Sequence, residues 1–543
     1  MNSLIIILIT GISFLWGYKF YARKLERLWQ IDPQRQTPAH TKYDGIDYVP
    51  ARNWLVLFGH HFSSIAGAGP IIGPVIACAL WGWLPAIIWI IAGTIFIGGA
   101  HDFGALMCSV RQEGSSISDI TKGVISNKAK IIFSVFVWLA LILVIAVFTY
   151  LCADTFIKEP RIVLPSLGLI PVAMLIGFLL YNVKANNTLA TILGLVLLSG
   201  LILWGDKFPL SLGGGGINAW IIILLIYCFI ASVMPVQILL QPRDYLSSFL
   251  LFAGVIFGYA GLAIVNPKIT QPAYTAWQSK EGSIWPMMCV TVACGAISGF
   301  HSLIASGTTS KQLAGESSAR RIGYGAMIAE GFVAVLAVLA VCAGIKDKNL
   351  SGLLKEIGPI NSFSRGYGEI TKVILGGWGS FIAVTILNAF ILTTLDTATR
   401  ISRYLTEELL GIKNRYLATI IVVVLSGLLA ISGAWQKIWP VFGASNQLVA
   451  ALALLVISCW LLYHKKTIKF TIFPAVFMFI TACLALVIQA QKYLKTGDYL
   501  LFIIASVLLI LAGYMCFEAF KVLFAPPFPA TANRSDEQKG GVL

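Results

Sequence analysis

Long apolar runs constrain the fold of this 543-residue chain more than any other feature of its sequence. Hydrophobic residues make up 58% of the chain and charged residues only 12%. A helix needs about 20 apolar residues to cross a bilayer, and many runs here are long enough. Within hydrocarbon a helix satisfies its own backbone hydrogen bonds. We therefore expect an all-α polytopic membrane protein.

The apolar runs between charged loops predict about fifteen transmembrane helices, with ends placed to within roughly four residues. The predicted spans cover residues 2–20, 54–80, 84–110, 131–153, 165–182, 189–204, 218–238, 247–266, 284–307, 323–345, 373–395, 416–432, 440–463, 470–488 and 498–518. We interpret residues 1–524 as a single transmembrane domain without an internal linker. Residues 525–543 contain prolines and then polar residues, which predicts a disordered cytoplasmic tail.

The basic residues are distributed unequally between the two sides of this predicted topology. Loops on one side carry 25 of the 39 lysines and arginines, loops on the other side carry 13, and Lys19 lies at a span end. The positive-inside rule then places the N-terminus outside and the C-terminus in the cytoplasm. The net charge of +15 is spread over short loops rather than one face, so we exclude nucleic-acid binding.

Two polar, glycine-rich interruptions resemble each other although they lie 240 residues apart. They are Gly59–Gly67 in the second predicted span and Gly299–Gly307 in the ninth, and each has a histidine six residues before its last glycine. Because the two spans are seven apart, they cross the membrane in opposite directions. Matched breaks of opposite direction indicate an inverted repeat, with halves at about 54–266 and 284–518, and two discontinuous helices at a transporter's binding site.

The second span should break between Gly67 and Pro70, because proline removes a backbone donor but is tolerated in the first turn of a new helix. The positive end of that half-helix would attract a carboxylate. The ninth span offers hydroxyl groups that can cap a half-helix or bind an anion. The predicted substrate-binding residues are His60, His61, Gly67, Ala68, Gly69, His301, Ser306, Gly307, Thr308 and Thr309. The alternative is that these glycines and prolines only allow close helix packing.

Ionisable residues at membrane depth are costly and usually functional. Asp102 and Glu330 each occur in the span that follows a broken one, and a desolvated carboxylate beside a histidine can carry a proton. The predicted ion-coupling residues are Asp102, Glu330, His101 and Asp396. Two alternatives stay open: a structural hydrogen bond between helices for any of them, and a helix-surface ion pair with Arg400 for Asp396.

A metal site is the remaining chemical interpretation of the histidines. Adjacent residues such as His60 and His61 point about 100° apart on a helix, so both cannot face one ion unless the helix is broken there. The chain has no HExxH motif and no phosphate-binding loop. We expect no metal and no cofactor, and transport driven by an ion or substrate gradient. A metal-dependent membrane enzyme or a passive channel is a minor alternative.

Several blocks of the sequence closely resemble the carbon starvation protein A family of the amino acid, polyamine and organocation transporter superfamily. The blocks are Phe58–Pro74, His101-Asp102, Gln241–Tyr245, Ser298–Lys311, Gly323–Ala326, Asp396–Arg400 and Trp439–Gln447. They are long and specific, and they extend over nearly the whole chain.

This resemblance implies an uptake carrier of the bacterial cytoplasmic (inner) membrane, surrounded by lipid and active under carbon starvation. It implies symport of pyruvate with a proton, or peptide uptake, and sodium is the alternative coupling ion. Both substrates have a carboxylate, which suits a half-helix N-terminus. A peptide would also need an anionic partner for its amine, and Asp102 or Glu330 could be that partner or the proton carrier.

Overall fold

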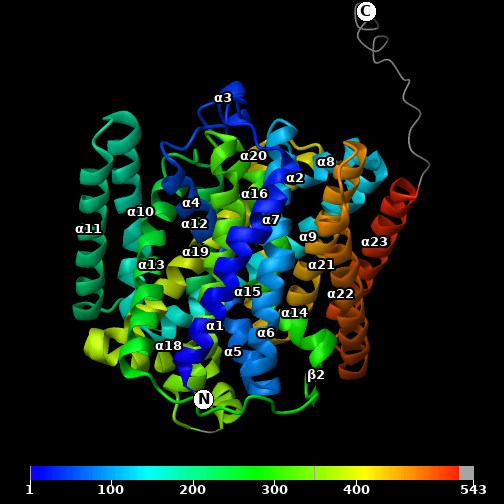
Figure 1. Cartoon of the computed structure of the whole chain (residues 1–543). Helices are drawn as coiled ribbons and strands as arrows, with labels where there is room; N and C mark the ends of the chain where they lie inside the picture. Colours follow the sequence, from blue (N-terminus) through cyan, green and yellow to red (C-terminus); the bar gives the residue numbers. More distant parts are fainter. Residues whose placement is uncertain (1, 214–215, 348, 525–543) are drawn as a thin grey trace, which may run out of the picture.

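The computed structural model describes residues 2–213, 216–347 and 349–524 of the chain. Helices that run roughly parallel to one another form one bundle, as the sequence predicts (Figure 1). The predicted tail, residues 525–543, lies outside the described residues.

The described helices and strands follow one another in a simple order. The α-helices are α1 (Ser3–Trp16), α2 (Ala22–Trp29), α3 (Pro38–Thr41), α4 (Trp54–Ile65), α5 (Gly69–Trp81), α6 (Trp83–Ala92), α7 (Gly99–Arg111), α8 (Ile117–Val124), α9 (Asn127–Lys158), α10 (Val163–Gly177), α11 (Asn187–Lys207), α12 (Gly216–Val233), α13 (Leu240–Val265), α14 (Cys289–Thr291), α15 (Ala293–Ala296), α16 (Gly299–Gly307), α17 (Gly325–Leu339), α18 (Leu350–Leu375), α19 (Gly379–Leu410), α20 (Arg415–Ile431), α21 (Trp435–Tyr463), α22 (Lys469–Thr496) and α23 (Tyr499–Leu523). Strands β1 (Gln278–Ser279) and β2 (Gly282–Ser283) pair in an antiparallel hairpin. Short π-helical and 3-10 segments join several of the helices.

Twelve helical segments of the described chain are long and apolar enough to cross a membrane, and the bent pair α4 and α5 makes thirteen. The predicted number of fifteen is therefore not confirmed. The predicted span 416–432 corresponds to α20, which has only 17 residues, and the span 284–307 is divided into short pieces. These two segments account for the difference.

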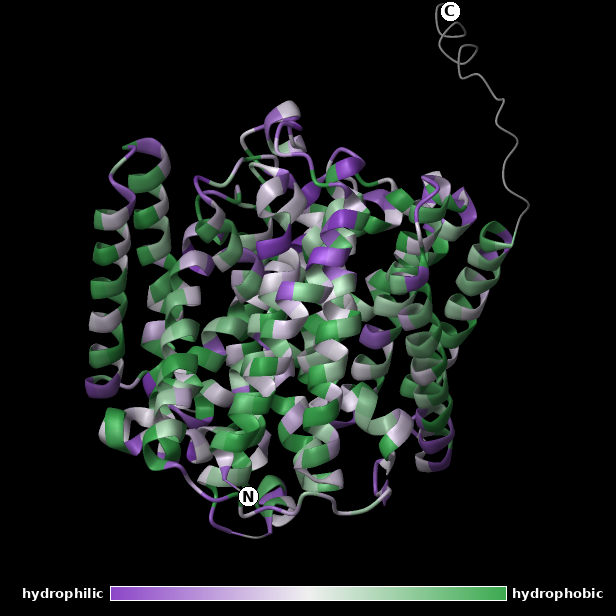
Figure 2. Ribbon diagram, viewed as in Figure 1, coloured by the Kyte–Doolittle hydropathy of each residue, from purple (hydrophilic) through white to green (hydrophobic). Residues whose placement is uncertain are grey.

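The surface of the bundle matches a membrane environment. Hydrophobic residues cover most of the height of the outer helices, while hydrophilic residues gather toward the two ends (Figure 2). Helix α1 begins at the lower end in Figure 1 and α23 finishes at the upper end, so the described chain starts and ends on opposite faces. Which face is cytoplasmic stays a prediction.

The second predicted span is broken where its glycines and prolines predict. Helix α4 ends at Ile65, α5 begins at Gly69, and the two axes differ by 43°. Pro70 lies in the first turn of α5, where its missing N–H costs nothing. Both discontinuous helices are present and in contact, since α4 packs against α16 and α5 packs against α15.

The ninth span is also broken, but not at the predicted hydroxyl residues. The helix is interrupted at Ile297 and Ser298, both in extended backbone conformations, and α16 continues through Ser306 to Gly307. Gly307 therefore ends a half-helix and is not the counterpart of Gly67. The equal histidine-to-glycine spacing does not reflect equivalent positions, because His61 precedes its break and His301 follows its own.

The predicted spans 323–345 and 373–395 leave residues 346–372 as a loop, and this prediction is wrong. Most of them form α18, which bends at Gly358 and packs against α5, α13 and α19. Helix α18 has an amphipathic pattern with charged residues on its exposed face, so a search for uniformly apolar runs misses it. The predicted span 373–395 is the first part of α19, which extends to Leu410.

The two broken helices have matching neighbours. Helix α5 packs against α17, which follows the second break, and α16 packs against α7, which follows the first. Helix α9 packs along α19, and α12 along α20. Each broken span therefore contacts the helix that follows the other broken span, which is the arrangement expected for an inverted repeat.

Candidate functional site

A small cavity lies at the centre of the bundle, between the two helix breaks. Its lining residues come from α4 and α5, α9, the break before α16, α19 and α21: Ile65, Gly67, Gly69, Pro70, Val144, Phe148, Cys294, Ser298, Phe300, Thr394, Phe442 and Asn446. It has room for roughly one water molecule. None of these lining residues is charged, and Phe148 and Phe442 are in edge-to-face contact.

Two half-helix N-termini begin at this cavity. Helix α5 starts at Gly69, and the N–H groups of Ala68 and Gly69 have no hydrogen-bond acceptor among the described residues. Helix α16 starts after Ser298, and the Asn446 side-chain oxygen accepts from the Phe300 N–H at 2.9 Å. The positive ends of both helix dipoles therefore face the central cavity.

Glycines allow the two broken helices to touch. A Cβ atom at Gly69 would lie 2.2 Å from Cβ of Cys294, and one at Gly73 would lie 2.3 Å from the Thr291 carbonyl oxygen. A Cβ atom at Gly67 would lie 2.8 Å from Thr394 Oγ1. Side chains at these positions would force the half-helices apart, so glycine is required by close approach.

A larger pocket lies on each side of the central cavity. On the side of the α5 C-terminus, a pocket of about 300 Å³ is lined by residues of α5, α18 and α21, including Trp439, and by Thr291 of α14. On the side of α8, a pocket of about 280 Å³ is lined by Ser306, Gly307 and Lys311 among others. A further small cavity adjoins both the central cavity and the second pocket, since it shares Phe300 with one and Leu303 with the other.

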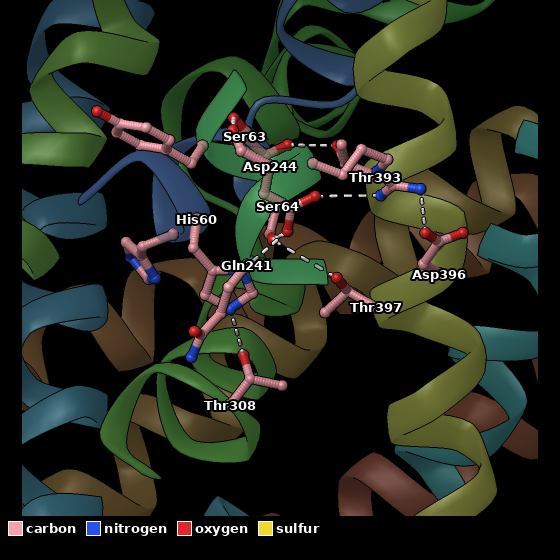
Figure 3. Close-up of polar contacts among 12 residues, drawn as sticks. His60, Ser63, Ser64, Gln241, Asp244, Thr308, Thr393, Asp396 and Thr397 are labelled. Carbon is pink, nitrogen blue, oxygen red and sulfur yellow. Dashed lines mark hydrogen bonds and ion pairs between the residues drawn. The ribbon is translucent and has the colours of Figure 1, made fainter. Parts of the chain in front are cut away.

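The first buried polar cluster connects α4, α12, α13 and α19, and part of it is drawn in Figure 3. The guanidinium of Arg243 is 3.1 Å from Asp244 Oδ1 and in direct contact with the carboxylate of Asp396. Asp244 Oδ2 lies 2.8 Å from Nδ1 of His60, and Tyr227 donates to Asp396 at 2.6 Å. All five side chains are buried, so these charges must be balanced within the cluster.

The second buried polar cluster joins α7, α16 and α17. Asp102 lies between two histidines, with Nδ1 of His101 at 2.8 Å and Nδ1 of His301 at 2.9 Å. Nε2 of His301 is 3.2 Å from Glu330 Oε2, within ion-pair distance but not aligned as a hydrogen bond. No arginine or lysine pairs with either carboxylate in the described chain, so protons on the cluster's own side chains can balance their charge.

The comparisons with known proteins agree with one another. The chain matches the family described as Carbon starvation protein CstA over residues 2–350 and 345–485. It is 31% identical to the Escherichia coli (strain K12) protein named Peptide transporter CstA, with 86% of this chain and 78% of that one covered. The Escherichia coli Pyruvate/proton symporter BtsT is also 31% identical, with 90% and 81% covered.

The chain belongs to the carbon starvation protein CstA family. The Bacillus subtilis (strain 168) Peptide transporter CstA is 30% identical, with 84% of this chain and 85% of that one covered. This membership identifies the chain as a membrane transporter. A solved Eremococcus coleocola manganese transporter has the same fold, with a TM-score of 0.53 at 12% identity over 88% of this chain and 99% of that one.

The structure separates the predicted substrate-binding residues of this CstA-family chain into three groups. Gly67 and Gly69 line the central cavity, and Ala68 lies between them in the break. Ser306 and Gly307 line the pocket beside α8 instead.

The third group consists of the predicted histidines and threonines that are in hydrogen-bonded or ion-pair contacts and are not among the lining residues of the central cavity. His60 lies 3.3 Å from Thr308 Oγ1, and His61 lies 2.9 Å from Thr309 Oγ1. His301 belongs to the second cluster. The side chains of these three histidines are about 1% exposed or less, because neighbouring helices pack around them.

The predicted ion-coupling residues lie in two places. His101, Asp102 and Glu330 share the second cluster, as their spacing relative to the breaks suggests. Asp396 belongs to the first cluster, where its partner is Arg243 and not the predicted Arg400, whose side chain instead contacts Asp47.

Arg243 and Asp244 are the main functional candidates that sequence reasoning missed. Arg243 lies between the predicted spans 218–238 and 247–266, where the sequence predicts a loop, yet it is 1% exposed inside α13. Arg400 and Arg403 lie between the predicted spans 373–395 and 416–432 and are also buried, inside α19. The signal available was that Arg243 and Asp244 belong to a family-specific block, as does Asn446.

Among the described residues, no group of three histidine, cysteine, aspartate or glutamate side chains is arranged to hold a metal ion.

Proposed function

We propose that this chain is a secondary active uptake carrier that binds a small carboxylate in the central cavity and couples its movement to a proton. Pyruvate is the proposed substrate, and peptides are the alternative, because relatives are named for each. We also propose that the carrier lies in the bacterial cytoplasmic membrane and acts when the bacteria are starved of carbon.

The central cavity is the observation that carries this proposal. Two half-helix N-termini begin there, and the unpaired Ala68 and Gly69 N–H groups can donate to an anion. Phe148, Phe300 and Phe442 form an apolar wall that suits a short carbon chain. A peptide ammonium group would find no carboxylate among the lining residues, and burying it unpaired would be costly.

The second cluster supports the proposed proton site. Two carboxylates and two imidazoles share a buried space without a fixed cation, so the number of bound protons decides its net charge. Both oxygens of Glu330 lack hydrogen-bond partners in the described chain, which favours Glu330 as the group that gains and loses the proton.

Alternating access would use the pockets on either side of the closed centre. We propose that the pocket beside α18 opens to the outside and the pocket beside α8 opens to the cytoplasm, in line with an external N-terminus and a cytoplasmic C-terminus. The matched neighbours of the broken helices support halves at about 54–266 and 284–518 that move relative to each other.

Uptake into proteoliposomes tests this function. Labelled pyruvate should accumulate when the outside is more acidic than the inside, and a labelled dipeptide should not. Accumulation of the dipeptide instead would select the peptide alternative. Substrate flux that runs only down the substrate's own gradient and does not respond to an ion gradient would indicate a channel. Chemical conversion of the substrate without its movement across the membrane would indicate an enzyme.

Cys294 allows the cavity assignment to be tested separately. Its Sγ lies 3.2 Å from Asn446 Nδ2 at the cavity wall. A maleimide bound to Cys294 should block uptake, and pyruvate at ten times its dissociation constant should slow that modification about tenfold. The rate is measured by mass spectrometry of the labelled peptide.

The control is a Cys294→Ser variant, whose remaining uptake should resist the maleimide. If pyruvate leaves the rate of Cys294 modification unchanged although it is transported, the substrate binds elsewhere.

A further inference from the structure

An open pocket lies where α12 and α19 end and α20 begins. Its volume of about 630 Å³ is within the range of small-molecule sites. One wall comes from the segment between α3 and α4, at the upper end of the bundle (Figure 1). Four lining residues are basic and two are acidic, which leaves an excess of positive charge: Arg400, Arg403, Lys413 and Arg415 against Asp47 and Glu407.

The two deeper arginines, Arg400 and Arg403, are buried at the end of α12. Each donates to a carbonyl oxygen there at 2.8 Å. The carboxylate oxygen that each approaches, on Asp47 or Glu407, is 3.5 Å away. Arginine–carboxylate hydrogen bonds usually measure about 2.7–2.9 Å. The Nε atoms of both arginines lack a hydrogen-bond partner among the described residues, so the two acids balance these buried charges only in part.

The outer edge of the pocket adds further positive charge. Lys413 and Arg415 are exposed, and neither forms an ion pair within the part of the chain that the structure describes. Asn414 is both a lining residue and the N-cap of α20, so the positive end of this helix dipole also lies at the pocket. An anion in the pocket would therefore meet buried arginines, exposed basic side chains and a helix N-terminus.

An apolar face of α12 and α20 leads away from the pocket along the outside of the bundle. Tyr416 lines the pocket, and its ring centroid is 6.4 Å from that of Phe229 on α12. About one turn further along the two helices, Ile226 and Ile420 are about half exposed. Because α12 packs against α20, these side chains border one apolar seam that faces the lipid. A tyrosine at the end of a span is typical of the membrane interface.

We propose that this pocket binds the phosphate of an anionic phospholipid whose acyl chains lie along α12 and α20. Basic pockets between transmembrane helices suit anionic headgroups, and the arginine guanidinium matches the geometry of phosphate oxygens. A free phosphate ion would use the same charges but would gain nothing from the apolar seam. The pocket lies on the face proposed above to be cytoplasmic, where anionic lipids make the membrane surface negative.

A lipid bound here would lie next to the proposed cytoplasmic opening. Tyr404 of α19 lines both this pocket and the pocket beside α8. A headgroup held by Arg400 and Arg403 would fix the end of α19 against the end of α12. The inference rests on the proposed function only for this effect on transport, since the lipid site itself is defined by α12, α19 and α20.

The test is lipid binding to the full-length protein in a neutral detergent, measured by native mass spectrometry without substrate. Phosphatidylglycerol should bind saturably, and phosphatidylcholine with the same acyl chains should not displace it. Lys413→Gln combined with Arg415→Gln should weaken phosphatidylglycerol binding about 25-fold, since each basic residue near a membrane surface contributes about fivefold to the affinity for anionic lipid. Both side chains are exposed, so this double variant should fold normally.

Lys465→Gln combined with Lys469→Gln is the matched control, because it removes two exposed lysines from the same predicted side of the membrane but outside the pocket. This control should bind phosphatidylglycerol within about twofold of the wild type. Equal binding of the two lipids by the wild type, or equal losses of affinity in the two double variants, would overturn the inference.

Inorganic phosphate distinguishes a lipid headgroup from a soluble anion. Radioactive phosphate should show no saturable binding in equilibrium dialysis, and it should not displace phosphatidylglycerol. If phosphate binds and phosphatidylglycerol does not, the pocket takes a soluble anion and the lipid assignment is wrong. A phosphatidylglycerol with a photoreactive acyl chain should label α12 and α20 more strongly than the matching phosphatidylcholine, and equal labelling by both would contradict the proposed position.

These measurements do not depend on transport. A failure of proton-driven pyruvate uptake would contradict the proposed function and leave lipid binding intact, so the two outcomes are distinguishable.

Discussion

Replacing Glu330 by glutamine is expected to abolish substrate accumulation driven by a pH gradient while leaving exchange of substrate across the membrane. Glu330 is buried, and its carboxylate lies 3.2 Å from His301 Nε2 without another partner in the described chain. Glutamine has nearly the same shape but cannot carry the proton. For symport with one proton, one pH unit supports about tenfold accumulation, and the variant should reach a ratio of about one.

The measurement compares net uptake of labelled pyruvate with counterflow in the same proteoliposomes. Asp102→Asn should behave similarly, because Asp102 orients both histidines of the cluster. Glu369→Gln, at an exposed site on α18, is the control and should accumulate normally. If Glu330→Gln and Asp102→Asn both accumulate pyruvate fully, the proton is carried elsewhere, and the cluster around Asp396 becomes the next candidate.

Replacing Arg243 by methionine should cause the largest loss of stability among single substitutions in the bundle. Methionine keeps much of the apolar volume but leaves the buried carboxylates of Asp244 and Asp396 without their cation. Removing one partner of a buried ion pair costs about 3–5 kcal/mol, so most of the protein should fail to fold. Membrane abundance and the unfolding midpoint in detergent measure this effect.

A double variant separates charge imbalance from lost packing. Arg243→Met with Asp396→Asn removes one charge of each sign and leaves Asp244 beside His60, so it should recover much of the lost stability. Arg365→Met, at an exposed arginine of α18, should change stability by less than about 0.5 kcal/mol. If the Arg243→Met protein has normal membrane abundance and a normal unfolding midpoint, the stability of the protein does not depend on the positive charge of Arg243.

The sequence by itself determined those features that depend on local chemistry. Apolar run length identified most of the spans, because crossing the bilayer depends on length and hydrophobicity within one segment. Gly67 and Pro70 located the first helix break, since proline and glycine act on the backbone where they stand. Asp102 and Glu330 were recognisable as candidates because charge inside an apolar run is costly wherever its partners are.

Only the tertiary structure decided which side chains meet. The second break lies at Ile297–Ser298, where an amide from α21 satisfies the first turn of α16, a partner about 150 positions away in the sequence. The sequence predicts a loop around Arg243, whereas α13 places this residue against Asp396. The sequence also predicts a loop where α18 packs its apolar face against α5 and α19. Burial of a polar group depends on partners from distant segments, and local spacing carries no information about which segments those are.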